Sequence, residues 1–343
     1  MIKIAAITQG KNSPAARFRI RQCIPYLYSQ EIHAREFYPP IPKNKKIRIG
    51  NLRQRYLFPV SSLFFATKVL SDIPFLLKTN AFDATWLNRE ILPRINLEKY
   101  LKQPLFFDVD DSIWISDREH IKKIALHSKV IIAGNQYIAD WFSQYNPNVE
   151  VVPTSIDLAR FISKQNTDTT FVIGWTGSSD NLKYLYGIED ALGEFLDNHP
   201  DSYLKVICDT LPAFQKIKRE KLIYRKWSPG TEVSELEDIS AGIMPLEDNE
   251  WTRGKCSFKM LQYMAMEKPV VVSPVGMNRE VTDDGEAGFF AGNPGQWYES
   301  LEYLYKHREK AQNMGQTGLD IVRKKYSTEV VSFKLAEIFK KNL

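Results

Sequence analysis

Residues 242–276 read GIMPLEDNEWTRGKCSFKMLQYMAMEKPVVVSPVG. The apolar runs at 241–246 and 269–274 have the length of buried strands, and an amphipathic helix is expected over 258–266 between them. A polar loop joins the first strand to this helix. Strand, helix and strand in this order are typical of a parallel sheet covered by helices. The stretch therefore predicts an α/β fold.

The same alternation extends over the whole chain. Strands are expected at 2–8, 83–88, 104–109, 129–133 and 149–153 in the first half, and at 169–175, 203–208, 222–226, 241–246, 269–274 and 287–291 in the second. From residue 295 onward the pattern is helical. We predict two Rossmann-like domains, joined by a polar linker at 163–169, whose strand ends face each other across a cleft.

Composition and charge support this interpretation. A chain of 343 residues is long for a single core. Its three cysteines show no paired spacing and its five histidines form no ligand cluster, so we expect neither disulfides nor a metal site. A membrane-spanning helix needs ~18 consecutive apolar residues, which the sequence lacks. The N-terminal residues do not follow the signal-peptide pattern. We therefore expect a cytoplasmic protein.

Positive charge is concentrated in the first half of the chain. Residues 1–150 hold 22 Lys and Arg against 13 Asp and Glu, whereas residues 151–343 hold 24 against 28. This asymmetry indicates a partner that contacts one half only. Because no basic helix is interleaved with aromatic residues, nucleic acid is not the expected partner.

The loop before the helix at 258–266 carries the clearest functional signal. Arg253 and Lys255 lie in this loop, and Ser257 is a plausible N-cap. A helix N-terminus attracts anions, and two cations beside it suit a diphosphate without Mg²⁺. A basic loop that is only solvated is the alternative, and these residues alone leave both interpretations open.

The stretch at 242–276 resembles glycosyltransferase family 4. The resemblance continues through NREVTDDGEAGFF at 278–290, and VVPTSID at 151–157 and IGWTGS at 173–178 support it. The family has the GT-B architecture of two facing Rossmann-like domains. The resemblance implies an acceptor-binding domain at 1–165, completed by a C-terminal helix at 326–343 that crosses back to it. A nucleotide-sugar-binding domain would occupy 166–325.

The resemblance also implies a reaction. Members of the family transfer a sugar from a nucleotide-activated donor with retention of configuration, usually without a metal. We expect transfer of a hexose, glucose or a related sugar, from a UDP-sugar to a glycan acceptor in polysaccharide or glycolipid synthesis. Two other classes stay open: a nucleotide-sugar epimerase of the same architecture, and a catalytically degenerate protein that binds a sugar nucleotide.

At two positions the chain departs from the family pattern. Members carry two glutamates with seven residues between them, where this chain has Gly254 and Gln262. The Gln262 amide can still hydrogen-bond ribose hydroxyls, without the gain that a charge provides. Gly254 offers no side chain, so Asp248 or Glu250 is expected to contact the donor sugar.

Further donor contacts follow from the resemblance. Gly177 and Ser178 would let the main chain approach the phosphates. Lys183 is either a phosphate ligand or a solvated helix lysine, and Trp227 either packs on the nucleobase or lies in the core. Glu280 either reaches the donor or is an ordinary helix residue. At the helix start the expected donor-site residues are Arg253, Gly254, Lys255, Cys256, Ser257 and Phe258.

The first domain offers candidates for the acceptor side. Asp108, Asp110 and Asp111 follow the strand at 104–109, at the sheet edge where ligands bind. One of these carboxylates could accept the proton of the acceptor hydroxyl, or they could cap the following helix. Arg17, Arg19 and Arg21 alternate at a helix start. One or two of them, with Arg17 and Arg19 as the acceptor-side candidates, are expected to face a phosphate, and at least one is expected to be ordinary surface charge.

A basic and apolar stretch at 43–65 suggests contact with a membrane. Six basic residues fall within 43–55, no acidic residue lies between positions 37 and 71, and leucines and phenylalanines follow. This composition is typical of peripheral docking on an anionic leaflet, here the inner face of the membrane, near a lipid-linked acceptor. The alternative is a solvated loop that leads into a core helix.

Overall fold

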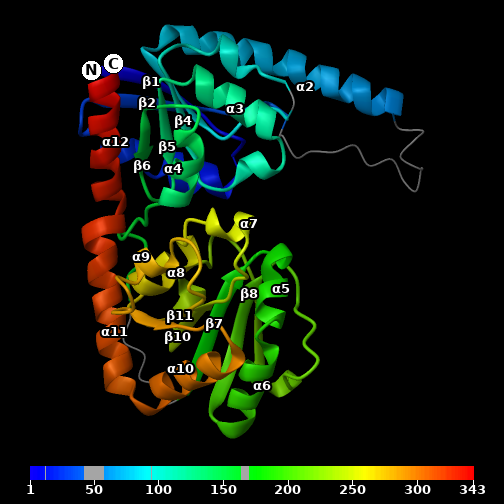
Figure 1. Cartoon of the computed structure of the whole chain (residues 1–343), viewed down its shortest axis with the longest axis vertical. Coiled ribbons are helices and arrows are strands. Elements are labelled where there is room, and N and C mark those ends of the chain that lie inside the picture. Colours follow the sequence, from blue (N-terminus) through cyan, green and yellow to red (C-terminus); the bar gives the residue numbers. More distant parts are fainter. Residues whose placement is uncertain (12, 42–57, 94, 164–169) are drawn as a thin grey trace. The chain divides into compact units, whose positions relative to one another are not determined.

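The computed structural model describes the chain except for residues 12, 42–57, 94 and 164–169, and except for the side chains of 58–65 and 75. The described residues form two compact units. Unit 1 comprises Met1–Thr154 together with Val331–Leu343, and unit 2 comprises Ser155–Val330 (Figure 1). The predicted linker at 163–169 lies almost entirely outside the described residues.

A six-stranded parallel sheet forms the centre of unit 1. Its order is β2-β1-β3-β4-β5-β6. The strands are β1 (Ile2–Ile7), β2 (Ile32–Phe37), β3 (Ala84–Asn88), β4 (Leu105–Val109), β5 (Val130–Ala133) and β6 (Val149–Val151). Strands β1, β3, β4 and β5 are almost fully buried, as expected for parallel strands covered on both faces.

Strand β2 is absent from the sequence-based prediction. It lies at the edge of the sheet and pairs in parallel with β1, with Ile32 opposite Ile2. Only Ile32 and Ala34 are buried, while His33 and Arg35 point to solvent. An edge strand exposes one side, so its few apolar residues do not form the continuous run that marks the central strands.

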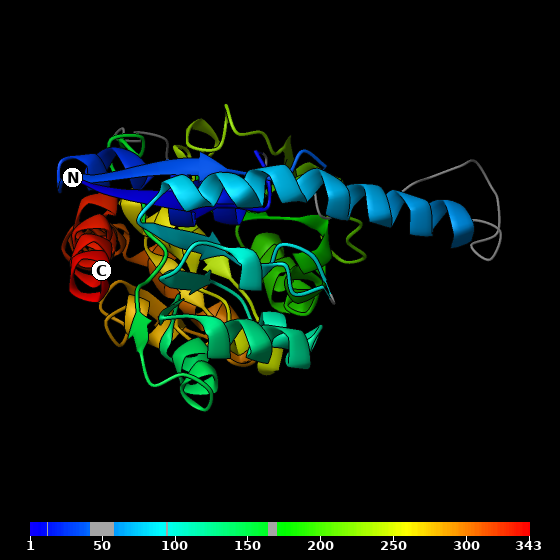
Figure 2. The ribbon, with the colours of Figure 1, turned by 90° about the horizontal axis from the view of Figure 1, so that it is seen from above.

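Helices cover both faces of the unit 1 sheet. They are α1 (Ile24–Tyr28), α2 (Phe58–Lys78), α3 (Arg118–His127), α4 (Gln136–Ser143) and α12 (Thr328–Asn342). Neighbouring residues of β4 face opposite sides: Phe106 packs on Phe339 of α12, and Phe107 packs on Phe142 of α4. The last helix thus completes the core of unit 1, as predicted. Helix α2 extends beyond the rest of the unit (Figure 1, Figure 2).

Unit 2 contains a second six-stranded parallel sheet, in the order β12-β11-β10-β7-β8-β9. Its strands are β7 (Phe171–Gly177), β8 (Ser202–Cys208), β9 (Leu222–Lys226), β10 (Ala241–Met244), β11 (Val270–Val272) and β12 (Gly288–Phe290). Its helices are α5 (Leu182–Tyr186), α6 (Glu189–Asn198), α7 (Glu250–Arg253), α8 (Phe258–Ala265), α9 (Asn278–Val281), α10 (Pro294–Lys306) and α11 (Arg308–Ile321). The predicted fold class of two Rossmann-like parallel-sheet domains is confirmed.

Successive residues of β10 face opposite sides of the sheet and contact different helices. Ala241 and Ile243 join the core that α6 and α10 cover. Gly242, between them, faces the other side, where a Cβ would lie 2.2 Å from the ring of Tyr263 on α8. Glycine at this position therefore allows α8 to pack directly on the strand.

The order of strands reverses at β7. From β7 the chain proceeds outward through β8 and β9, and then returns to the other side for β10, β11 and β12. Ligands of doubly wound sheets bind at the carboxyl ends of the strands beside such a reversal. In unit 2 this point lies where β7 and β10 end, and the loops at 178–181 and 245–257 begin there.

Candidate functional site

The loop after β10 is more ordered than the sequence predicts. It contains the short helix α7, which Asn249 caps together with Thr252 in a reciprocal capping box. The last residue of α7, Arg253, makes a bidentate ion pair with Asp248 at 2.6 and 3.0 Å. The hydrogen bond from Arg253 lowers the pKa of Asp248. These two predicted site residues thus contact each other at an exposed position.

Ser257 occupies the N-cap position of α8 but does not cap it. Its backbone is left-handed, with φ of 50°, and its side chain makes no hydrogen bond to the helix. The hydroxyl instead donates to Oδ1 of Asn278, a residue of α9, at 2.7 Å. The expected capping hydrogen bond is therefore wrong, because a left-handed residue does not have the extended backbone that a capping side chain requires. Ser257 therefore links the start of α8 to the start of α9.

Two lysines lie close to the start of α8. The amine of Lys255 is 5.4 Å from the ring centroid of Trp251, which is 40 % exposed. The amine of Lys259 is 4.9 Å from the ring centroid of Trp175 on β7. A Cβ at Gly177 would lie only 2.6 Å from the Lys259 amine, so glycine at the end of β7 leaves room for this cation. Sequence analysis missed Lys259, because a lysine in the first turn of a helix is usually solvated.

A carboxylate that directly follows β8 holds the loop after β7. Asp209 accepts hydrogen bonds from the Ser179 amide at 2.7 Å and from its hydroxyl at 2.9 Å. Burial acts to raise the pKa of Asp209, but the bonds from Ser179 outweigh burial and lower it. The neighbouring Ser178 is exposed, and Lys183 extends from α5 over the ring of Tyr184. The structure therefore leaves both interpretations of Lys183 open.

The Gln262 side chain is already engaged within unit 2. Its amide nitrogen donates to the carboxylate of Glu232 at 3.0 Å, and both side chains are buried. Arg160 lies 3.7 Å from the other oxygen of Glu232. Glu232 comes from the loop after β9, so its carboxylate reaches α8 from a distant segment of the chain.

The other predicted donor residues differ in exposure. Trp227 is half-buried after β9, and its backbone amide donates to the Cys208 carbonyl at 3.0 Å. Glu250 and Glu280 are exposed. Gly254 and Cys256 are buried, and Phe258 is half-buried at the start of α8. These positions alone do not assign a contact to the donor.

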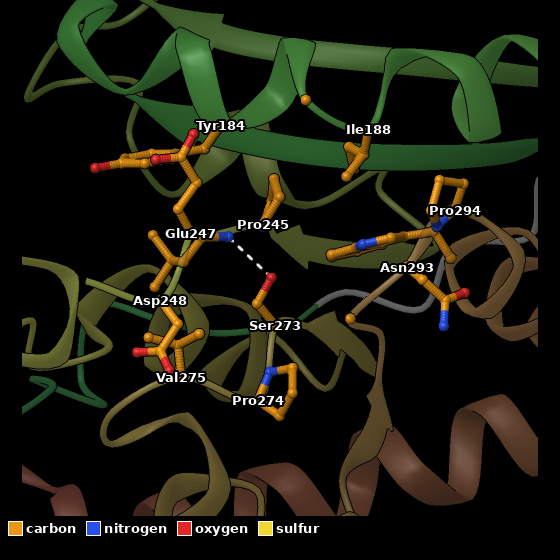
Figure 3. A pocket seen from close by; sticks show the side chains of 14 residues that line it. Tyr184, Ile188, Pro245, Glu247, Asp248, Ser273, Pro274, Val275, Asn293 and Pro294 are labelled. Carbon is orange, nitrogen blue, oxygen red and sulfur yellow. Dashed lines mark hydrogen bonds between the residues drawn. The ribbon is translucent and has the colours of Figure 1, made fainter.

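A pocket of about 440 Å³ opens at the carboxyl ends of β10, β11 and β12 (Figure 3). The residues that line it include Tyr184, Glu247, Asp248, Ser273 and Asn293. Ser273 accepts a hydrogen bond from the Leu246 amide at 2.9 Å, which joins the loops after β10 and β11. Carboxylates, an amide and hydroxyls are suitable partners for a polyhydroxylated ligand. Asp248, predicted to contact the donor sugar, lies in this lining.

In unit 1, Asp108 and Arg19 form a buried ion pair. Arg19 binds both carboxylate oxygens at 2.9 and 3.2 Å and also donates to the Val152 carbonyl. Trp86 donates a further hydrogen bond to Asp108 at 3.2 Å. Burial raises the pKa of Asp108, and the guanidinium of Arg19 opposes that rise. Both side chains are committed to the core, so the structure contradicts a proton-accepting Asp108 and an Arg19 that faces a substrate.

Asp110 and Asp111 also pair within unit 1. Both contact the guanidinium of Arg89, with 2.6 Å between Asp110 and its Nε. Arg89 has a left-handed backbone with φ of 59°, which turns the chain directly after β3. Burial acts to lower the pKa of Arg89, but the two carboxylates outweigh it and raise this pKa. Arg17 lies over the ring of Phe18, 4.7 Å from its centroid.

Two further features concern metals and membranes. Among the described residues, no group of three or more His, Cys, Asp or Glu side chains is arranged to hold a metal ion. Within the same residues, no helix combines the length and the apolar character needed to cross a bilayer. The three cysteines all lie within the described residues, are buried and form no disulfide. Residues 43–57 of the predicted membrane-contacting stretch lie outside the described residues, and the side chains of 58–65 are likewise not described.

Comparison with known proteins places these features in a class. The family model described as Glycosyl transferases group 1 matches residues 170–307. A search of the curated proteins found no match. Among solved structures, sucrose-phosphate synthase from Thermosynechococcus elongatus is similar, with a TM-score of 0.73 and 11 % identity over 99 % of both chains.

Two further neighbours were solved with a nucleotide. Anabaena HepE in complex with UDP and glucose has a TM-score of 0.70 and 13 % identity, over 99 % of this chain and 100 % of HepE. The S. aureus MnaA–UDP structure has a TM-score of 0.60 and 11 % identity, over 99 % of this chain and 96 % of MnaA. The chain therefore has the GT-B fold. The matched domain and these neighbours together support a glycosyltransferase enzyme.

Proposed function

We propose that the chain is a family 4 glycosyltransferase that transfers a hexose, glucose or a related sugar, from a UDP-sugar to a hydroxyl group of a glycan acceptor. In this proposal the domain at 166–325 holds the donor, and the domain at 1–165 with the helix at 326–343 holds the acceptor. One observation carries it: Lys255 and Lys259 flank the start of α8, beside the carboxyl end of β7, within the matched glycosyltransferase domain. HepE, a structural neighbour, was solved with UDP-glucose.

The proposed role of the protein is to position the donor and to stabilise the leaving diphosphate. Lys255 and the N-terminal dipole of α8 would offset the charge that develops on the leaving phosphate. Arg253 would contribute after exchanging its partner Asp248 for the phosphate, or by orienting Asp248 toward the donor sugar. With retention, an oxygen of the leaving phosphate would assist removal of the proton from the acceptor hydroxyl.

Calorimetric titration with UDP tests the donor site. We expect wild-type protein to bind UDP and Lys255→Ala to bind it more weakly by ~1.5–3 kcal/mol, as for a charged hydrogen bond. Lys310→Ala is a matched control, since its amine lies over the ring of Tyr303 on α10, away from the α8 loop. Unchanged affinity in Lys255→Ala would remove this residue from the phosphate site.

Product analysis separates the classes that share this architecture. A transferase releases UDP and forms a glycosidic bond with the acceptor, whereas an epimerase converts the donor sugar without an acceptor. Binding of UDP with neither reaction nor slow donor hydrolysis would indicate a degenerate binding protein. We propose that the reaction needs no metal, so activity is expected to persist in excess EDTA. Loss of activity that Mg²⁺ or Mn²⁺ restores would contradict this.

We also propose that the acceptor is linked to a lipid and that residues 43–65 contact an anionic membrane surface, at the inner face of the membrane. Leu70, Ile73 and Leu77 of the following part of α2 are exposed, which supports an apolar contact along this helix. We expect sedimentation with anionic but not neutral vesicles, and weaker binding at high salt. Lys43, Lys45 and Lys46 changed together to Glu should abolish it. A wild-type protein that stays in the supernatant at low salt would refute the contact.

A further inference from the structure

Three features define the position of the Lys259 side chain. It leaves the first turn of α8, its amine lies 4.9 Å from the Trp175 ring centroid, and it fills the space that a side chain at Gly177 would need. It therefore lies at the carboxyl end of β7, where the strand order of the sheet reverses. This is the place at which doubly wound sheets bind anionic ligands.

The amine of Lys259 has a defined position, but no counter-ion among the described residues. Among the described residues, no carboxylate forms an ion pair with it and no oxygen accepts a hydrogen bond from it. The titratable groups that act on it are Lys255 from the preceding loop and Cys208 from β8. Burial, followed by repulsion from Lys255, lowers the pKa of Lys259 to about 7. A neighbouring cation and a half-buried position without an acid are unfavourable for a charged lysine unless an anion joins them.

We propose that Lys259 is a phosphate-contacting residue of the donor site and that its amine takes up a proton from solvent when the nucleoside diphosphate binds. The inference rests on the proposed function and adds to it a direct phosphate contact for Lys259 and a proton-coupled binding step. The neutral amine gains one proton and becomes ammonium, and the diphosphate supplies the opposite charge between Lys255 and Lys259. Trp175 and Gly177 hold the amine in place before the ligand arrives.

Binding measurements between about pH 7.5 and 8.5, where the diphosphate of UDP is ionised and its uracil N–H is still protonated, test the coupling. Because the ligand raises the pKa of Lys259, wild-type affinity should fall as pH rises, by up to about tenfold per unit. Calorimetry in buffers of different ionisation enthalpy should show net proton uptake near pH 8. Lys259→Met should bind UDP at least about tenfold more weakly at pH 7.5, with neither proton uptake nor this pH dependence. Lys259→Arg, which stays charged, should bind without proton uptake.

Lys310→Met is the matched control, because it removes a solvated lysine that also lies over an aromatic ring. Thermal unfolding without ligand adds a second measurement. Loss of this half-buried cation should raise the melting temperature of Lys259→Met, most below pH 7, while the shift caused by UDP becomes smaller. A wholly structural lysine would not give opposite signs in these two measurements.

The possible outcomes are distinct. If wild-type protein binds UDP with proton uptake that Lys259→Met abolishes, the proposal stands. If wild-type protein binds UDP but Lys259→Met binds it equally well, the proposal for Lys259 is overturned while the proposed function survives. If the wild-type protein binds neither UDP nor other nucleoside diphosphates, the proposed function itself fails.

Discussion

Gln262 shows how a single residue acquires its role from its partner. Its amide donates to the buried carboxylate of Glu232, which fixes the side chain within unit 2. Glu232 accepts a hydrogen bond from one of the two N–H groups of this amide. A contact with ribose hydroxyls, as expected from the sequence, would therefore use the other N–H group or the amide oxygen. The pair places an anion beside α8 without a glutamate at position 262.

The geometry predicts that Gln262→Glu destabilises the protein. Two buried carboxylates would meet, and their repulsion would raise a pKa in the folded state above its unfolded value. Stability is then lost as pH rises, so we expect a loss of about 1–3 kcal/mol at pH 8 and a smaller one at pH 5. Urea unfolding at both pH values measures this. The double variant Glu232→Gln, Gln262→Glu should recover most of the loss, and equal stability of the single variant at pH 8 would contradict the pairing.

The ion pair of Arg19 with Asp108 leads to a second prediction. Arg19→Met would leave a fully buried carboxylate without its cation, at a cost of about 3–5 kcal/mol near neutral pH. The orphaned Asp108 would have a pKa raised further in the folded state, so the loss should shrink as pH falls toward 5. Chemical unfolding at pH 5 and 8 checks the trend. Adding Asp108→Asn should restore part of the stability; a pH-independent loss would argue against an uncompensated charge.

At the scale of elements, helix α11 packs unusually close to the turn after α8. Gly315 lies in the middle of α11, and a Cβ there would be 2.0 Å from the carbonyl oxygen of Glu267. Gly193 is also buried within a helix, α6, but its nearest neighbours would lie 3.7 Å away. Two helix glycines thus have different reasons to be present, close packing in one case and no steric need in the other.

Alanine substitutions should separate these two cases. Gly315→Ala must move the turn at Glu267 away from α11, and such overpacking costs about 1–3 kcal/mol. Gly193→Ala fits, and the higher helix propensity of alanine should stabilise the protein by up to ~1 kcal/mol. Melting temperatures of the two variants measure the contrast. Similar values for both would mean that the approach of Glu267 to α11 is looser than described.

At the scale of the whole molecule, unit 1 is assembled from both ends of the chain. Val331–Leu343 joins residues 1–154, and Phe339 packs edge-on against Trp86 and Phe106. The central part of the chain forms unit 2 by itself. The core of unit 1 is therefore incomplete until the last residues are in place.

Removing the ring of Phe339 tests this dependence. Phe339 is fully buried, so Phe339→Ala should cost about 3–5 kcal/mol of unfolding free energy. Phe333 lies on the same helix but is 52 % exposed, and Phe333→Ala should change stability by less than about 0.5 kcal/mol. Hydrogen exchange should show the loss in the strands of unit 1, with protection of β7 and β8 unchanged. Equal losses in both units would mean that they unfold together.

Much of the fold could be predicted from sequence because central parallel strands are buried on both faces. Their side chains are apolar without alternation, and the runs at 105–109 and 270–272 are recognisable for that reason. Edge strand β2 lacked such a run. Helix α7 lay in a loop that composition marks as polar, and the signal that could have located it was the Asn249 and Thr252 pair of its capping box.

The candidate site, like the fold, could be predicted from sequence only in part. The local pattern at 242–276 predicted a cationic loop before a helix, because the order of strand, loop and helix depends on consecutive residues. Only tertiary structure decided that Lys259 meets Gly177, that Gln262 meets Glu232, and that Arg19 meets Asp108. Each pair joins residues far apart in the chain. A side chain's charge and polarity are set by its own identity, but its burial and its partner depend on which distant segment packs against it.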